Sequence, residues 1–142
     1  MKQDVIVIGA GIIGLATAER LLLQGANVTI LERHAVGQES SWAGGGILSP
    51  LCPWDYSDEV TRFTSYSAKL FPDWCSLLHH ATGIDPEYEV SGMLILPPHD
   101  QKTALEWCSM REVRIRQCSI PTIESSKMNL EGLLLPEVAQ VR

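Results

Sequence analysis

The N-terminal part of the chain carries successive apolar runs whose period changes from strand-like to helical and back. Residues 4–8 are a short run rich in β-branched side chains, which predicts a buried strand. Apolar side chains recur with helical spacing over residues 12–23, and Gly25 stands where such a helix would end. Residues 27–31 form a second apolar run. The order strand, helix, strand predicts a βαβ unit whose two strands are parallel.

The middle of the chain predicts a loop followed by a long helix. Residues 34–53 are rich in glycine and have little periodicity, so they predict a loop. Apolar residues return at steps of three and four over residues 57–80, which is the longest helical pattern in the chain. Pro72 lies inside this pattern and predicts a kink or a break, and Gly83 marks its end.

The last third of the chain predicts short elements. Residues 88–96 read as extended chain that ends at the two prolines 97 and 98. Asp100 is placed to cap a helix that runs to about Met110. Further short elements are predicted over residues 113–116 (a strand), 121–127 (a helical turn) and 132–135 (a strand).

Composition narrows the class of protein. The 142 residues suit about one domain, and the charged and hydrophobic fractions are those of a globular protein. The net charge is −6 and the basic residues do not cluster, so we expect no nucleic-acid partner. The four cysteines show no CxxC spacing, so we expect no metal site and a reduced, cytoplasmic protein. No apolar run is long enough for a membrane-spanning helix, so we expect no membrane partner.

The first eighteen residues resemble a secretory signal peptide only superficially. Lys2 supplies a positive charge and a small-residue triplet at residues 16–18 resembles a cleavage site. Asp4 neutralises the charged region, however, and glycines at regular spacing interrupt the apolar stretch. We therefore interpret this segment as part of the folded protein.

The glycines after the first predicted strand form a dinucleotide-binding fingerprint. Gly9, Gly11 and Gly14 make a G-x-G-x-x-G sequence that follows a strand and opens a helix, and Glu32 ends the second strand. Gly9 allows the tight turn, Gly11 allows the backbone to approach a pyrophosphate, and Gly14 allows close packing of helix and strand. The helix N-terminus favours phosphate, and Glu32 can accept hydrogen bonds from ribose hydroxyls. The alternative is a glycine-rich turn that binds nothing, and the fingerprint does not separate NAD from FAD.

A second glycine-rich segment follows soon after Glu32. It begins with Ser40 and Ser41, which could bond a pyrophosphate, and continues through Gly44, Gly45 and Gly46 to Ile47. Adjacent glycines let the main chain lie flat against a planar ring, with N–H groups directed at the polar edge of the ring. This favours a flavin over a nicotinamide. The alternative is a plain flexible loop on the surface, which is the favoured interpretation when this segment is taken by itself.

These segments together resemble the D-amino-acid-oxidase-like family of FAD-dependent oxidoreductases, and within it the bacterial glycine oxidases of thiamine biosynthesis. The resemblance rests on residues 9–14, on Glu32 and Arg33, and on residues 40–54. Its most specific parts are the triple-glycine segment and the closing stretch at residues 135–142. It covers nearly the whole chain, with further similar stretches at residues 71–74, 82–88, 91–94 and 135–142.

The resemblance implies a set of cofactor contacts. Gly9, Gly11 and Gly14 would hold the FAD pyrophosphate. Glu32 would bind the adenosine ribose, and Arg33 would lie near the adenine. Ser40 and Ser41 would line the pyrophosphate and ribityl region. The remaining residues, which would lie along the isoalloxazine, are Gly44, Gly45, Gly46 and Ile47.

The resemblance also implies a fold and an activity. The fold class would be α/β, with a Rossmann-like FAD-binding unit over residues 1–83 and the incomplete start of an α+β substrate domain over residues 84–142. The activity would be oxidative deamination of glycine or a similar small amine by FAD and molecular oxygen, giving an imine and hydrogen peroxide for thiazole formation. The family's substrate-binding arginine and tyrosine lie in its C-terminal half, so we assign no catalytic residue, and a homo-oligomer stays open.

Two other functions remain open. One is another amine or D-amino-acid oxidoreductase of the same family, since the residues that shape the substrate pocket separate these enzymes. The other is a non-catalytic nucleotide-binding module. The sequence stops at Arg142 just after an apolar run without a polar tail. We therefore expect a fragment that is inactive and poorly soluble when made alone.

Overall fold

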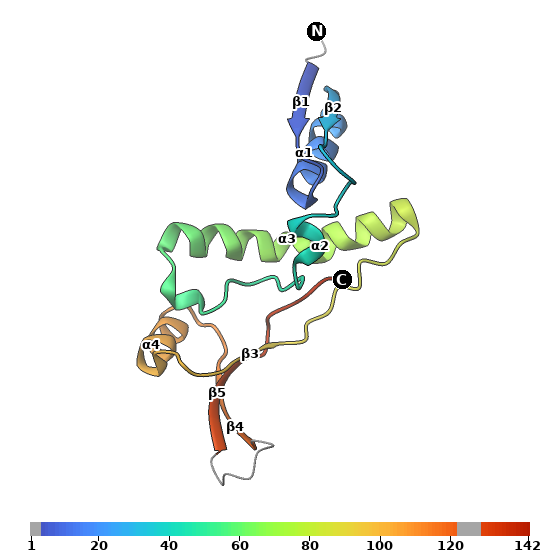
Figure 1. The fold of residues 1–142 in the computed structure, drawn as a ribbon. Helices are drawn as coiled ribbons and strands as arrows, with labels where there is room; N and C mark the ends of the chain where they lie inside the picture. Colours follow the sequence, from blue (N-terminus) through green and yellow to red (C-terminus); the bar gives the residue numbers. More distant parts are fainter. Residues whose placement is uncertain (1–3, 122–128) are drawn as a thin grey trace. The chain divides into compact units, whose positions relative to one another are not determined.

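The computed structural model describes residues 4–121 and 129–142, and the chain divides into two compact units (Figure 1). The first unit covers residues 1–45 and the second covers residues 46–142. This division concerns packing within the chain. The predicted functional boundary between residues 83 and 84 remains a prediction.

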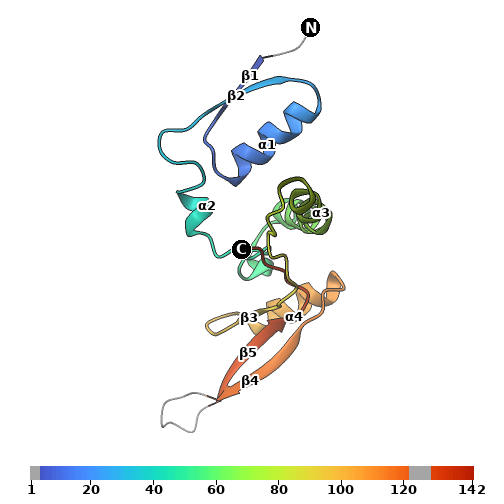
Figure 2. The same ribbon diagram turned by 90° about the vertical axis from the view of Figure 1, so that its right-hand side faces the viewer.

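The first unit is built on the predicted βαβ arrangement. It contains β1 (Asp4–Ile8), α1 (Ile12–Leu23), β2 (Asn27–Leu31) and α2 (Ser40–Ala43). The strands β1 and β2 are parallel, with a register that runs from Asp4 opposite Asn27 to Ile8 opposite Leu31. Figure 2 shows α1 alongside this two-stranded sheet. The prediction of parallel strands is confirmed, and the short helix α2 interrupts a segment predicted to be entirely loop.

The expectation that both strands are buried is wrong for this chain. Ile6 and Ile8 of β1 are 64% and 85% exposed, and Ile30 and Leu31 of β2 are exposed as well. A parallel sheet is normally covered on both faces. Here the described part of the first unit offers the two strands one long helix, so apolar side chains remain in contact with solvent.

The second unit combines helices with a three-stranded antiparallel sheet. Its helical elements are the 3-10 turn η1 (Pro53–Asp55), α3 (Asp58–Thr82) and α4 (Gln101–Met110). Its strands are β3 (Met93–Ile95), β4 (Arg116–Pro121) and β5 (Asn129–Leu135). The strand order is β3-β5-β4, so β5 is central and pairs with both neighbours.

The long helix α3 continues through Pro72, so a break at that proline is wrong. The ring removes one backbone donor, but the turns on either side keep the helix continuous. Gly83 ends the helix as predicted, with a φ of +73° and a bond from its N–H to the carbonyl oxygen of His79. None of the helices in residues 4–121 is both long and apolar enough to cross a membrane.

Several short elements differ from their predicted bounds. The extended segment predicted over residues 88–96 contains only the three-residue strand β3, and the strand predicted over 113–116 begins at Arg116 as β4. The strand predicted over 132–135 lies within β5. The helical turn predicted over 121–127 falls almost entirely outside the described residues. Asp100 caps α4 as predicted, because its carboxylate accepts from the Thr103 N–H at 3.1 Å.

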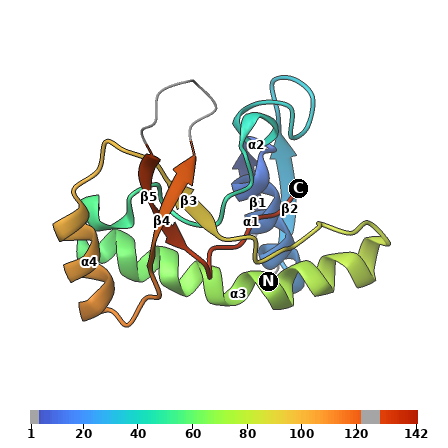
Figure 3. The same ribbon diagram turned by 90° about the horizontal axis from the view of Figure 1, so that it is seen from below.

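The core of the second unit lies between its sheet, α4 and η1. The buried residues that form it are Trp54, Met93, Ile95, Ala104, Cys108, Leu133 and Leu135. Arg111 joins α4 to the start of α3 through an ion pair with Asp58, and its guanidinium lies over the Trp107 ring at 5.2 Å from the centroid. Figure 3 shows α4 beside the N-terminal half of α3. Cys52, in the segment after Gly46, packs against this core, and so does Val138.

Candidate nucleotide-binding site

The turn between β1 and α1 is built on glycine at two positions. Gly9 has a φ of +100°, which side chains rarely adopt, and its N–H donates to the Leu31 carbonyl oxygen at 2.8 Å. A Cβ added at Gly14 would lie 1.9 Å from the Gly9 carbonyl oxygen. The first turn of α1 therefore lies against the end of β1 at a distance that only glycine allows.

The N-terminus of α1 is joined to the second glycine-rich segment by a side chain. The Ser41 hydroxyl oxygen accepts from the Ile12 N–H at 2.9 Å, and a Cβ at Gly11 would lie 3.0 Å from that same oxygen. The first backbone bond of the helix runs from Leu15 to Gly11. The start of the helix thus presents N–H groups next to a hydroxyl that still has its own proton to donate.

Glu32 is fixed against the glycine turn. Its carboxylate accepts from the Ala10 N–H at 2.7 Å and from the His34 N–H at 3.0 Å, one bond to each oxygen. These two hydrogen bonds, the one from Ala10 more than the one from His34, hold the pKa of the Glu32 carboxyl below its ordinary value. The group is therefore ionised at neutral pH. Each oxygen keeps acceptor capacity, which is what the hydroxyls of a ribose require.

Arg33 lies on the surface beside the ribose-binding candidate and has a partner that the sequence did not indicate. Its guanidinium forms a forked ion pair with Glu39, with Nη2 lying 2.7 Å from one carboxylate oxygen and 2.8 Å from the other. This pair joins the two ends of the loop between β2 and α2. The proposed position of Arg33 near an adenine remains a prediction.

The residues predicted to lie along the isoalloxazine fall in both units. Ser40 begins α2, and Gly44 follows the helix in extended conformation. Gly45 has nothing within 4 Å of an added Cβ, whereas Gly46 has a φ of +68° and an added Cβ would lie 1.8 Å from the Val141 carbonyl oxygen. Ile47 is exposed and forms a β-bridge with Gln140. The contacts with residues 140 and 141 link segments far apart in the sequence, and no local pattern indicated them.

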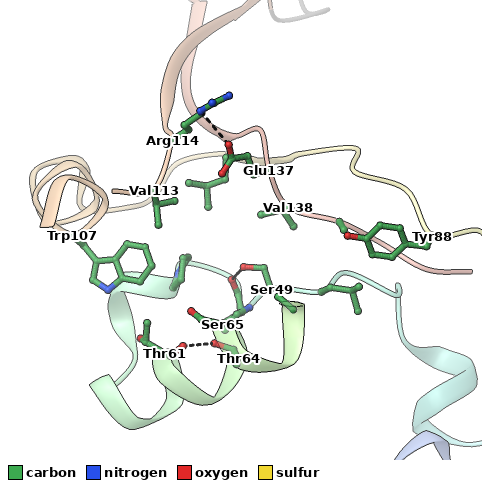
Figure 4. A pocket seen from close by; sticks show the side chains of 16 residues that line it. Ser49, Thr61, Thr64, Ser65, Tyr88, Trp107, Val113, Arg114, Glu137 and Val138 are labelled. Atoms are coloured by element: carbon green, nitrogen blue, oxygen red, sulfur yellow. Dashed lines mark hydrogen bonds and ion pairs between the residues drawn. The ribbon is translucent and has the colours of Figure 1, made fainter. Parts of the chain in front are cut away.

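A cavity of about 250 Å³ in the second unit adjoins the segment after Ile47. Figure 4 shows Thr61, Thr64 and Ser65 of α3 on one side and the Arg114–Glu137 ion pair on another. Ser49 and Tyr88 add further hydroxyl groups to the lining. Among the described residues that line the cavity, Arg114 is the only lysine or arginine, and its guanidinium forms an ion pair with Glu137 at 3.1 Å. The described lining therefore offers a substrate carboxylate no cation without an acidic partner.

The described residues fit a dinucleotide in the first unit. The turn tolerates no side chain at Gly14, and a hydroxyl lies at the helix N-terminus, which suits a pyrophosphate. An ionised carboxylate at the end of β2 suits the hydroxyls of a ribose. Among residues 4–121 and 129–142, no cluster of three metal-binding side chains occurs. The glycine and carboxylate geometry thus suits a nucleotide cofactor.

Residues 4–132 match the family of proteins described as FAD dependent oxidoreductases (DAO). The chain belongs to this family. The resemblance inferred from the glycine segments is confirmed, and so is FAD as the cofactor, because the family depends on it.

Relatives of known name agree with this assignment. The glycine oxidase of Pseudomonas aeruginosa is 48% identical over 107 residues, which cover 75% of this chain and 29% of that protein. The bifunctional protein ThiO/ThiG of Trichormus variabilis is 36% identical over 95 residues, covering 66% of this chain and 14% of that protein. The chain therefore spans less than a third of the length of either relative.

A solved structure matches the fold over nearly the whole chain. The glycine oxidase from Bacillus cereus superposes with a TM-score of 0.81 over 99% of this chain and 40% of that one, at 24% identity. A likeness at this identity supports the fold alone, and it confirms the predicted α/β fold class.

Proposed function

We propose that the protein containing this chain oxidises glycine or a similarly small amine with FAD, and that molecular oxygen is the electron acceptor. The observation that carries the proposal is the 48% identity with a glycine oxidase over 75% of the chain. The chain also carries side chains that suit the cofactor, since Glu32 and Ser41 are held at the glycine turn. The family membership gives the cofactor, and the proposal adds glycine or a small amine as the substrate.

The residues of the chain have distinct proposed roles toward the cofactor. Glu32 accepts hydrogen bonds from the ribose hydroxyls, and its ionised state strengthens those bonds. Ser41 and the N–H groups at the start of α1 bind the pyrophosphate, as Gly9, Gly11 and Gly14 leave room for it. Ser40 completes the pyrophosphate side, with Arg33 near the adenine. The residues that would lie along the isoalloxazine are Gly44, Gly45, Gly46 and Ile47.

The reaction needs little acid–base chemistry from this part of the protein. When bound, FAD supplies the two-electron chemistry that turns the amine into an imine and reduces oxygen to hydrogen peroxide. The substrate gives up two electrons and two protons, and both reappear in the peroxide. The task of residues 1–142 is therefore to bind and orient the cofactor. We assign the substrate-binding function to residues 84–142 together with chain that follows in the longer relatives.

The bifunctional relative supports a proposal about the pathway in which the reaction takes place. An imine made from glycine is a small electrophile that a later condensation can use, and the ThiO/ThiG protein is named for two activities joined in one chain. We propose that the imine supplies thiazole formation in thiamine biosynthesis, in the cytoplasm.

The test uses the protein expressed from its complete coding sequence. Purified protein should be yellow and should release hydrogen peroxide with glycine, and more slowly with sarcosine and D-alanine. Glu32→Gln should raise the FAD dissociation constant about tenfold or more, because the ribose hydroxyls then donate to a neutral acceptor in place of a charged one. Glu131→Gln makes the same chemical change on an exposed residue of β5 and should leave FAD binding unchanged.

The outcomes separate the candidate functions. Oxidation of D-alanine without any oxidation of glycine would assign the protein to another branch of the family. A protein that retains FAD but oxidises none of the three amines would overturn the amine oxidase proposal.

A further inference from the structure

The last residues of the chain form a backbone clamp on the segment that contains Gly46. The Val141 N–H donates to the Gly46 carbonyl oxygen at 3.0 Å, and the Leu48 N–H donates to the Ala139 carbonyl oxygen at 2.9 Å. A β-bridge between Ile47 and Gln140 lies between these two bonds. Residues 46–48 are therefore held by antiparallel pairing with residues 139–141.

The clamp is fixed from its other side as well. Glu89 and Gln140 exchange two backbone hydrogen bonds, of 2.9 Å and 2.8 Å. The Arg142 N–H donates to the Pro86 carbonyl oxygen at 3.0 Å, and the Gly92 N–H donates to the Val138 carbonyl oxygen at 2.9 Å. Residues 138–142 thus lie between two segments of the chain, and Gln140 forms an isolated β-bridge to each of them.

Gly46 is the position where the clamp requires glycine. Its φ of +68° lies in the left-handed region, and an added Cβ would lie 1.8 Å from the Val141 carbonyl oxygen. A side chain at position 46 would therefore push residues 46–48 away from residues 139–141. The obstacle is backbone, which cannot rotate aside as a flexible side chain would.

The same segment also lines the cavity described above. Leu48, Val138 and Ala139 are among the lining residues, and the bond from Leu48 to Ala139 joins the two sides of that wall. Displacement of the clamp would therefore change both the segment expected beside the flavin and the wall of the adjoining cavity.

We propose that residues 138–142 are a positioning element for FAD, which holds the backbone of Gly46 and Ile47 in the conformation that binds the isoalloxazine. Gly46 and the backbone of Val141 are the positioning residues. The inference rests on the proposed flavin contacts of residues 44–47. It assigns a cofactor-related role to a segment that makes no proposed contact with the cofactor itself.

The first experiment compares Gly46→Ala with Gly83→Ala in the complete protein. Both glycines have a φ of +73° or slightly less, but an added Cβ at Gly83 has nothing within 4 Å. The pair therefore shares the backbone strain and differs in the collision. Gly46→Ala should raise the FAD dissociation constant at least tenfold and change the visible spectrum and two-electron potential of the retained flavin. Gly83→Ala should change none of these three properties.

The second experiment removes one clamp bond by deleting its donor. In Val141→Pro, the ring carbon of the proline takes the place of the amide hydrogen that faces the Gly46 carbonyl oxygen. Val141→Pro deletes the donor to the Gly46 carbonyl and should raise the FAD dissociation constant several-fold. Hydrogen exchange of the unmodified protein gives a readout that needs no variant. Addition of FAD should slow exchange of the Val141 and Leu48 amides, because binding and clamp stabilise the same conformation.

The results distinguish this inference from the proposed function. If Gly46→Ala binds FAD as tightly as Gly83→Ala with an unchanged spectrum, the clamp has no positioning role. If Gly46→Ala and Val141→Pro both fail to fold, hydrogen exchange of the unmodified protein decides. Exchange at the Val141 and Leu48 amides that is unchanged by FAD would overturn the inference. A protein that binds FAD and shows these effects, but oxidises no amine, would refute the amine oxidase proposal and leave the clamp intact.

Discussion

Replacement of Gly14 by alanine tests how closely α1 lies against the end of β1. The added Cβ would lie 1.9 Å from the Gly9 carbonyl oxygen and 3.0 Å from its carbon, which is about 1.5 Å short of an ordinary contact. Overpacking of this kind costs about 3 kcal/mol or more where the obstacle is backbone. Alanine recovers about 1 kcal/mol of helix propensity over glycine. The expected net loss is therefore about 2 kcal/mol or more.

Two measurements are made. The cofactor-free protein is unfolded in urea, and the FAD retained by a separate, FAD-loaded sample is measured after desalting. Gly45→Ala is the matched control for stability, because an added Cβ there has nothing within 4 Å and the residue has no positive φ. Gly14→Ala should unfold at a clearly lower urea concentration than both the unmodified protein and the control. It should also retain less FAD than the unmodified protein. Equal unfolding midpoints for Gly14→Ala and Gly45→Ala would refute the close approach of helix and strand.

Three further predictions concern the site and the thiols. Gly11→Val should abolish FAD retention, because the side chain would displace Ser41 and occupy the space proposed for the pyrophosphate. The circular dichroism of the cofactor-free protein should stay unchanged. Normal FAD retention would place the phosphates elsewhere. The lowered pKa of Glu32 means that its stabilising bonds are complete above the unfolded pKa of about 4.3 and are lost as pH falls through the folded value. The melting-temperature difference between the unmodified protein and Glu32→Gln should therefore be constant at neutral pH and shrink below about pH 4; a pH-independent difference would contradict this. Burial raises the pKa of the Cys75 and Cys108 thiols, so mass spectrometry should find both alkylated by iodoacetamide much more slowly in the native protein than in urea, and equal rates would show that these sites are open.

The sequence predicts the first unit better than the second for a physical reason. The βαβ arrangement of residues 4–31 follows from local apolar periods and from glycines whose spacing has a steric meaning. The ends of α3 and α4 follow from Gly83 and Asp100, which satisfy backbone groups within one turn. These signals act over a few residues, so a single sequence contains them.

The rest depends on contacts between distant segments. The order β3-β5-β4 is set by which strand lies in the middle, and no residue of β5 (Asn129–Leu135) specifies that position by itself. The helix α2 has only four residues and therefore no apolar period to detect. Burial of β1 was predicted from composition alone, whereas exposure depends on how much covering structure the chain provides. The site shows the same limit, because the glycine run at residues 44–46 indicated a ring-binding segment but not its pairing with Val141.

The pairing of residues 46–48 with residues 139–141 has a consequence for synthesis of the protein. The N-terminus of the chain leaves the ribosome first, so β1, α1 and β2 can form before most of the chain has been synthesised. The segment at Gly46 cannot acquire its native partners until residue 141 has left the exit tunnel. Nascent chains arrested before that residue should therefore contain the glycine turn and Glu32 but lack the paired conformation of residues 46–48. With the cofactor contacts proposed above, the groups for the nucleotide end of FAD would form first, and those for the ring end only after residue 141 is made.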